Sequence, residues 1–187
     1  MSHSQTASAA SPAQPITLVS GLMLLALVIV TVAGWIALGG LLLGVKSFFA
    51  SFLFLWYWAA VEKAEFDRLA PALIGAMVGV ALAWQTRFLT THDPQHGLIL
   101  ALVVICIALF VQIMDWAPLA VNAATMLFLT VLGAPALLGA ADFVELTKAV
   151  VLGAAFFAMA VYLAKVYVAA RARARAQAPS ATASGHA

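Results

Sequence analysis

No Lys, Arg, Asp or Glu side chain occurs before Lys46, and residues 16–44 form one long uncharged, largely apolar stretch. A cleaved secretory signal has a basic start and an apolar region of about 7 to 15 residues. This stretch lacks the basic start and is far longer. A helix of about 20 residues crosses the roughly 30 Å hydrocarbon layer of a bilayer. We therefore expect a retained transmembrane helix rather than a signal peptide.

The rest of the chain has the same character. Of its 187 residues, 65% are apolar and 9% are charged, whereas charged residues make up about 25% of an average soluble domain. Nine basic and seven acidic side chains are too few to cover the surface of a 19.6 kDa globule. Most of the surface must therefore face lipid. The sequence predicts an integral membrane protein whose partner is the lipid bilayer, and it gives no reason to expect nucleic-acid binding.

Charged or turn-rich breaks divide the chain into six apolar segments. The fold class expected is an all-α integral membrane protein with six transmembrane helices in residues 16–170. Two tails flank it: a disordered one, residues 1–15, and a basic, then disordered one, residues 171–187. The six segments are residues 17–44, 47–61, 69–84, 98–114, 116–138 and 149–169.

Two segments, 47–61 and 69–84, are shorter than a membrane crossing requires. We favour continuous helices whose ends run on through Lys46, Glu62 and Lys63 over a pair that dips into the bilayer and returns. The segment 116–138 carries Gly133 and Pro135, and a kink or unwound turn is expected there.

The basic residues predict the orientation. With both termini in the cytoplasm, six of the nine lie on the inner side, as the positive-inside rule requires. The inner set is Lys63, Arg68, Lys165, Arg171, Arg173 and Arg175, and the outer set is Lys46, Arg87 and Lys148.

The two halves of the chain resemble each other weakly. Residues 25–30 match 100–105 at an offset of 75, residues 50–55 match 124–129 at 74, and a charged pattern at 62–68 matches 142–148 at 80. Three crossings per half would make the halves inverted copies, as in many channels and transporters. We predict a 3+3 inverted repeat, residues 17–84 and 98–169, with coincidence among apolar residues as the open alternative.

Polar side chains inside the apolar segments are the candidate pathway. Gln112 and Asn122 carry amides where an unpaired polar group is costly. Thr125 follows Asn122 at helical spacing, and Ser51 matches Thr125 across the offset of 74. These four residues are predicted to line a path for a small solute. The alternative is that they hydrogen-bond to neighbouring helices.

Acidic residues near the segment ends are candidates for a mouth or gate: Glu62, Glu65, Asp115, Asp142 and Glu145. The alternative is ordinary membrane-surface turns with local ion pairs. Asp115 precedes Pro118, a pattern typical of a helix N-cap.

Catalysis and cofactors have little support in the sequence. Cys106 is the only cysteine, so no intramolecular disulfide and no cysteine-based metal site is possible. His92 and His96 flank a proline and are expected to lie in a loop, with no third strong ligand nearby. No nucleophile, base and orienting group stand at readable spacings. We expect neither an enzyme, nor a cofactor, nor a metal.

The run WIALGGLLLGVKSF (residues 35–48), with Ile74 through Trp84 after a polar turn, resembles a family of small bacterial inner-membrane proteins known only as a domain of unknown function. The similarity extends through Gln112 and residues 118–130, and it implies a bacterial inner-membrane location. Leu69 through Trp84 is also similar to a Gly-rich helix of fusaric-acid-resistance-type exporters. Neither resemblance supplies functional residues.

We therefore expect a small inner-membrane channel or facilitator for a neutral or weakly charged solute. The alternative is a non-transporting accessory or assembly subunit. The pair Gly75 and Gly79 predicts close helix packing within the bundle or between subunits. A homo-oligomer or a larger membrane complex is expected.

Overall fold

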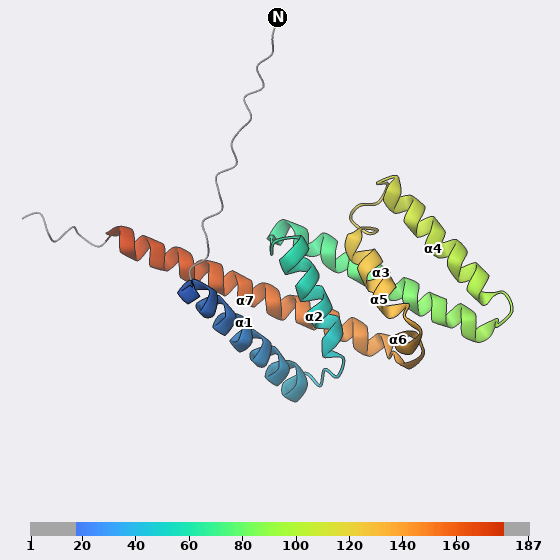
Figure 1. Ribbon diagram of the computed structural model, residues 1–187, viewed down its shortest axis with the longest axis horizontal. Coiled ribbons are helices and arrows are strands. Elements are labelled where there is room, and N and C mark those ends of the chain that lie inside the picture. Colours follow the sequence, from blue (N-terminus) through green and yellow to red (C-terminus); the bar gives the residue numbers. More distant parts are fainter. Residues whose placement is uncertain (1–17, 178–187) are drawn as a thin grey trace, which may run out of the picture.

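The computed structural model describes residues 18–177, and all of its regular structure is helical (Figure 1). The all-α prediction is therefore confirmed for these residues. The two predicted tails fall outside them, except that the last helix continues through Arg171 and Arg173. The elements are α1 (Leu18–Ala37), a π-helical turn η1 (Leu38–Leu42), α2 (Phe48–Trp56), a second π-helical turn η2 (Tyr57–Val61), α3 (Phe66–His92), α4 (Gly97–Ile113), α5 (Ala123–Leu132), α6 (Pro135–Ala140) and α7 (Phe143–Gln177).

Three stretches are long and apolar enough to cross a membrane: Gly21–Leu42, Phe66–His92 and Phe143–Ala174. Shorter apolar helices lie between them, at Phe48–Val61, Gly97–Ile113 and Ala123–Leu132. The expectation of a helical chain with several membrane spans thus holds in this coarser form.

The shorter segments differ from the prediction in an informative way. The second does not run on through Lys46 or Glu62, because its helix begins at Phe48 and η2 ends at Val61. The third is longer than its apolar segment, from Phe66 to His92, but it does not include Lys63, which lies in the turn before it. In the fifth, the expected break is confirmed, since α5 ends at Leu132 and α6 begins at Pro135. The N–H of the first residue of a helix has no carbonyl partner within the helix, so proline, which has no N–H, loses no hydrogen bond at the start of α6.

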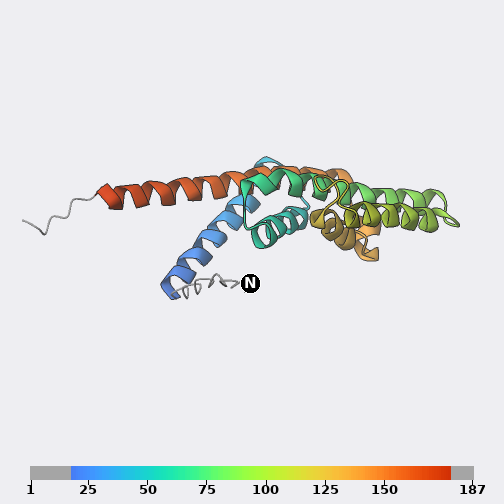
Figure 2. The ribbon, with the colours of Figure 1, turned by 90° about the horizontal axis from the view of Figure 1, so that it is seen from above.

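Two long helices form the frame of the molecule. α3 and α7 run in opposite directions and lie side by side in the middle of the molecule, and each extends beyond the other at one end (Figure 1). α2 packs on α7, and α5 packs on α3. α1 and α4 lie at opposite ends of the molecule, α1 against α7 and α4 against α3. Figure 2 shows that α1, α2 and α5 all lie on one side of the layer that α3 and α7 make.

The core sits where the short helices meet the long ones. Its largest fully buried side chains are Trp35, Trp58, Phe54, Phe128 and Phe157. By contrast, most large side chains of α1 and α4 are exposed and apolar. A helix that keeps only a narrow strip buried in protein and exposes leucine, valine and isoleucine elsewhere is suited to lipid.

Candidate functional site

Ser51 lies on α2 and is completely buried. Its hydroxyl oxygen accepts a hydrogen bond from the Trp35 indole nitrogen of α1 at 2.8 Å. The same hydroxyl donates to the carbonyl of Phe48, 2.7 Å away, one turn earlier in the chain. Both capacities of the hydroxyl are therefore used within the protein, and the first bond fastens α1 to α2.

Thr125 lies on α5, 74 residues after Ser51, and is also fully buried. Its hydroxyl accepts from the backbone N–H of Asn122 at 3.1 Å and donates to the carbonyl of Ala120 at 3.0 Å. Thr125 therefore serves the start of its own helix. Ser51 and Thr125 are the fully buried polar side chains among the described residues, and no hydrogen bond joins them.

Asn122 begins α5 instead of lying within a longer helix. Its side-chain oxygen accepts from the backbone N–H groups of Ala124 and Thr125, at 3.0 and 3.4 Å. With the returning bond from Thr125 this is a complete capping box. The amide nitrogen donates to the carbonyl of Pro71 on α3 at 2.9 Å. The predicted mid-span amide is therefore a cap that ties α5 to α3, and helical spacing does not extend back from it toward Pro118.

Glycines allow both short helices to approach their long partners closely. A Cβ atom on Gly79 would lie 2.6 Å from the carbonyl oxygen of Thr125, and one on Gly153 would lie 2.3 Å from the Cβ of Ser51. A Cβ on Gly75 would lie 2.1 Å from the side-chain oxygen of Asn122. The predicted close packing at Gly75 and Gly79 is thus found inside the chain, beneath α5. Gly153 has the same role beneath α2, and the sequence reasoning missed it.

Gln112 stands apart from the other predicted pathway residues. It lies near the end of α4, and its side-chain oxygen is buried without a hydrogen-bond partner among the described residues. The structure brings Asn122 and Thr125 together, while Ser51 bonds to Trp35 and the Gln112 oxygen has no hydrogen-bond partner among the described residues. A solute path along these groups stays a prediction.

The acidic residues Glu62 and Glu65 lie in the turn between η2 and α3. The Tyr57 hydroxyl donates to Glu62 at 2.8 Å. The backbone carbonyl of Glu65 accepts from the buried indole of Trp58 at 2.9 Å, while the Glu65 side chain is exposed. Nearby, the Lys165 ammonium of α7 donates to the carbonyl of Ala64 at 3.0 Å. This turn is therefore fastened to α7.

Asp142 and Glu145 lie at the start of α7. One oxygen of Asp142 accepts from the N–H groups of Val144 and Glu145, at 3.0 and 3.2 Å, which is an N-cap arrangement. Glu145 accepts from the backbone N–H of Lys46 at 2.6 Å and pairs with Lys148 at 2.7 Å. The Lys148 ammonium also donates to the carbonyl of Gly44 at 3.0 Å. These contacts join the start of α7 to the loop before α2.

Asp115 is exposed and caps no helix. It follows α4 with a positive φ of 53°, and α5 begins only at Ala123. The N-cap expected from Asp115 and Pro118 is therefore wrong. The N-cap of α5 is Asn122, because residues 114–122 form turns that separate Asp115 from the helix.

Groups that would hold a metal are absent from residues 18–177, where no three His, Cys, Asp or Glu side chains come together. His96 lies 3.4 Å from Asp93, and both belong to the exposed turn between α3 and α4. The polar contacts of the described residues mainly hold helices and turns together.

No family model matches the chain, and no curated protein or solved structure is similar to it at a significant level. The two resemblances drawn from sequence therefore stay predictions.

Proposed function

We propose that this chain is a six-span membrane protein made of two inverted halves, and that it acts as a channel or facilitator for a small, neutral or weakly charged solute. The observation that carries the proposal is the pair of short helices α2 and α5. Short or interrupted helices in corresponding positions of two halves are the best general pointer to a transport site. α2 has nine residues before η2, and α5 has ten before the break to α6.

Burial supports the duplication. Ten pairs of residues 74 apart, which relate α2 and η2 to α5 and α3 to α7, have both members buried, even where the side chains differ greatly in size. The agreement does not extend to α1 and α4, where the buried Trp35 matches the exposed Leu109. Composition does not explain this agreement, because an alanine matches a phenylalanine and a glycine matches an alanine. The pairs are Ala50/Ala124, Ser51/Thr125, Phe54/Phe128, Trp58/Leu132, Ala72/Leu146, Gly75/Ala149, Ala76/Val150, Gly79/Gly153, Val80/Ala154 and Ala83/Phe157.

The contacts follow the same relation. Thr125 lies on Gly79, and Ser51 lies on Gly153, so each short helix packs on the long helix of the other half. In Figure 1 a half turn about the viewing direction brings α1, α2 and α3 close to the places of α4, α5 and α7. This arrangement favours one offset of 74 over the charged match at 80.

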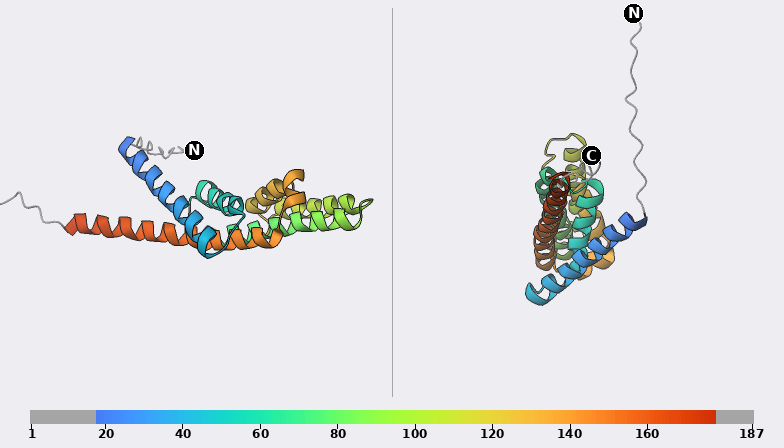
Figure 3. Two further views of the ribbon diagram at one scale, coloured as in Figure 1. Left: turned by 90° about the horizontal axis from the view of Figure 1, so that it is seen from below. Right: turned by 90° about the vertical axis from the view of Figure 1, so that its left-hand side faces the viewer.

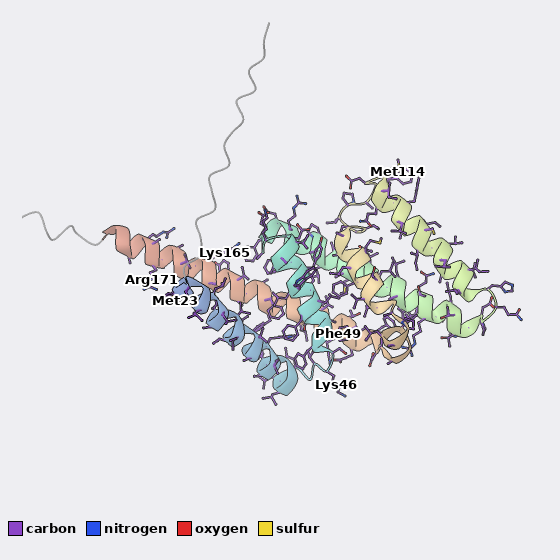
Figure 4. The ribbon with its side chains drawn as sticks, in the orientation of Figure 1. Met23, Lys46, Phe49, Met114, Lys165 and Arg171 are labelled. Carbon is purple, nitrogen blue, oxygen red and sulfur yellow. The ribbon has the colours of Figure 1, made fainter. Side chains whose placement is uncertain are left out.

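Charged contacts support the six-span topology. The loop before α2 meets the start of α7 through Lys46, Glu145 and Lys148, and the turn before α3 meets the later part of α7 through Lys165. Figure 4 shows Lys46 at one end of the bundle and Lys165 and Arg171 toward the other. We propose that the end with Lys165 is cytoplasmic, because it carries the larger share of basic residues.

Labelling of single cysteines tests this topology. In a Cys106→Ser background, Gln95→Cys and Ser180→Cys should react with a membrane-impermeant reagent from opposite faces of inside-out and right-side-out bacterial inner-membrane vesicles. Reaction of both positions from the same face would contradict the six-span proposal.

Flux through proteoliposomes tests the transport proposal. A solute that passes between the halves must replace hydrogen bonds that Ser51 and Asn122 now make within the protein. We expect swelling in neutral polyols or amides to require the wild-type chain and to fall with Ser51→Leu. The matched control is Thr147→Leu, which removes an exposed hydroxyl from α7. Equal flux in both variants, with both folded, would place the path elsewhere.

A second candidate function is a non-transporting accessory subunit of a membrane complex. One observation favours it: both fully buried hydroxyls have protein partners, which suits a structural role as well as a path. A well-folded chain that gives no flux with any tested solute, and that copurifies with one membrane protein at fixed stoichiometry, would support this candidate over the channel.

A further inference from the structure

Two adjoining hollows lie between the C-terminal half of α3 and the start of α7. One is a groove of about 610 Å³ near the α3–α4 turn, and it includes Arg87, His92 and Asp142. The other, also about 610 Å³, is mostly apolar: it is lined by Met77, Val80 and Ala81 among others, and its polar residues are Thr147 and Lys148. Both are walled by Trp84, Phe143 and Val144, so they form one groove with a polar end and an apolar end.

Arg87 is held in place at the polar end. One guanidinium nitrogen donates to the carbonyl of Ala141, just before α7, and the guanidinium lies 5.8 Å from the centre of the Phe143 ring. A guanidinium has five N–H groups in a fixed fork and suits the oxygens of a phosphate. The contact to Ala141 uses one of them, so the group is fixed in position while it keeps donors for a ligand.

The polar end also carries a negative charge. Asp142 lines the groove and is exposed, although one of its oxygens caps α7. The polar end therefore offers one fixed cation, Arg87, and one carboxylate, Asp142, and His92 lies in the exposed last turn of α3. The other cation that lines the groove, Lys148, is already paired with Glu145. A ligand with one phosphate and one ammonium group matches this pair of charges.

The place of the groove in the fold suits an amphiphile. α3 has 27 residues, about 40 Å, and is longer than the hydrocarbon layer. Its last turns, with Arg87, therefore lie in the headgroup region. Trp84, Phe88 and His92 stack along this part of the helix, with ring centres 5.5 and 4.1 Å apart, as in an aromatic belt. Ala81 and Met77 lie farther from that end, toward the middle of the bilayer.

The groove opens at the surface of the α3–α7 layer. Figures 2 and 3 show α1, α2 and α5 on one side of this layer, and no residue of these three helices lines the groove. Trp84 and Val144 are exposed in the chain. Lipid can therefore reach the groove sideways from the bilayer.

We propose that this groove binds one phospholipid with an ammonium-bearing headgroup. Its phosphate lies on the Arg87 guanidinium, its ammonium group faces Asp142, and an acyl chain lies along Ala81 and Met77. This site is separate from the proposed solute path and does not depend on transport.

Lipid retention tests the proposal. The full chain is purified in a mild detergent, mixed with phosphatidylethanolamine, and the bound lipid is counted by native mass spectrometry. Arg87→Gln should lower retention about tenfold, since a hydrogen bond to a charged group is worth about that factor. Arg68→Gln is the matched control, because it removes an exposed arginine from the other end of α3.

A second pair of variants keeps the test independent of folding around Arg87. Ala81→Trp fills the apolar end, and Ala70→Trp puts the same side chain on exposed α3 surface outside the groove. Only Ala81→Trp should displace lipid. Asp142→Asn keeps the N-cap and should reduce the preference for phosphatidylethanolamine over phosphatidylglycerol.

Two results would overturn the proposal. The first is equal retention in Arg87→Gln, Ala81→Trp and their controls, which would mean that lipid binds elsewhere. The second is a wild-type dimer that Ala81→Trp converts to a monomer without a change in bound lipid, which would assign the groove to a second copy of the chain.

Discussion

The two short helices, α2 and α5, each pack on a glycine of a long helix, but their buried hydroxyl groups form different hydrogen bonds. α2 lies on α7 with Ser51 against Gly153, and α5 lies on α3 with Thr125 against Gly79. Ser51 reaches Trp35 on α1, sixteen residues away. Thr125 bonds to Asn122 and Ala120, close by in sequence. One hydroxyl therefore joins two helices, and the other completes the start of one.

Because of this difference, a buried side-chain hydrogen bond fastens α1 to the rest of the protein, and none of this kind fastens α4 among the described residues. α1 is fastened by a buried hydrogen bond from Trp35, whose side chain is completely buried. No side-chain hydrogen bond among the described residues joins α4 to another helix, and α4 packs mainly on α3. Ser51 and Thr125, 74 residues apart, thus make the same kind of contact with a glycine of a long helix but form different polar bonds.

The largest expected effect is at the glycines. Gly153→Ala places a Cβ 2.3 Å from that of Ser51, and Gly79→Ala places one 2.6 Å from the Thr125 carbonyl oxygen. Overpacking of this kind costs about 1 to 3 kcal/mol, so both variants should unfold at clearly lower temperature in detergent. Gly139→Ala is the control, because nothing lies within 4 Å of its Cβ position.

Second-site changes sharpen this comparison. Ser51→Gly removes the atom that Gly153→Ala meets, so adding Gly153→Ala to Ser51→Gly should cost far less than adding it to the wild type. Thr125→Gly should not rescue Gly79→Ala, because the nearest atom there belongs to the backbone. If both pairs behave alike, the two contacts differ less than the structure indicates.

The next largest effect is at the buried hydroxyls. Ser51→Ala leaves the buried Trp35 indole N–H without its partner, and an unsatisfied buried donor costs about 1 to 3 kcal/mol. Trp35→Phe removes that donor, so Ser51→Ala should cost little in a Trp35→Phe background. The measurement is a double-mutant cycle on thermal unfolding in detergent, with Thr125→Val as the parallel change in the other half. Full additivity of Ser51→Ala and Trp35→Phe would exclude the bond as a source of stability.

A smaller effect is expected at the start of α5. Asn122→Ala removes the cap and the bond to Pro71, and loss of an N-cap costs about 0.5 to 2 kcal/mol. Asn122→Asp keeps the capping oxygen and removes the amide N–H groups that donate to the carbonyls of Pro71 and Pro118, so it should cost less than Asn122→Ala. Asp115→Ala should change stability little, because Asp115 is exposed and caps nothing. A larger loss at Asp115 than at Asn122 would mean that α5 starts earlier in the membrane.

The sequence predicts the helices better than it predicts the site, and particular residues show why. Apolar segments and their charged ends locate the helices, and Gly133 with Pro135 marks the break after α5. Asn122 is harder, since an amide in an apolar segment looks the same whether it begins a helix or lies within one. In the sequence, Asp115 and Pro118 look like the start of a helix. The helix starts at Asn122 instead, whose amide bonds to the carbonyl of Pro71, 51 residues away, and local sequence does not reveal that contact.

Gly153 and Arg87 show a second limit. The offset of 74 that relates Ser51 to Thr125 also relates Gly79 to Gly153, so that glycine was within reach of the sequence pattern. The role of Arg87 was not within reach of the sequence pattern, because the sequence marks Arg87 only as a basic residue on the outer side. Its contacts with Ala141 and Phe143 depend on how α3 lies against α7, which local spacing does not encode.

The smallest effect is expected where the halves differ in charge. At the start of α7, Glu145 accepts from the backbone of Lys46 and pairs with Lys148, whereas Pro71, 74 residues before Glu145, has no charge. Because the pair lies at the edge of the bundle, with about 38% of the Lys148 side chain exposed, Lys148→Met should cost only about 0.2 to 1 kcal/mol. Part of that loss comes from the bond to the carbonyl of Gly44 and should persist in salt, while the ion-pair part should fade as salt screens the charges.

Thermal unfolding of wild type and Lys148→Met at low and high salt separates the two parts. The matched control is Lys165→Met, farther along α7. There the ammonium donates to the carbonyl of Ala64 and lies over the Phe66 ring. Among residues 18–177 no carboxylate pairs with Lys165, so the cost of Lys165→Met should depend less on salt than the cost of Lys148→Met. An equal salt dependence would mean that Glu145 contributes no ion pair of its own and that the charge difference between the halves has no effect on stability.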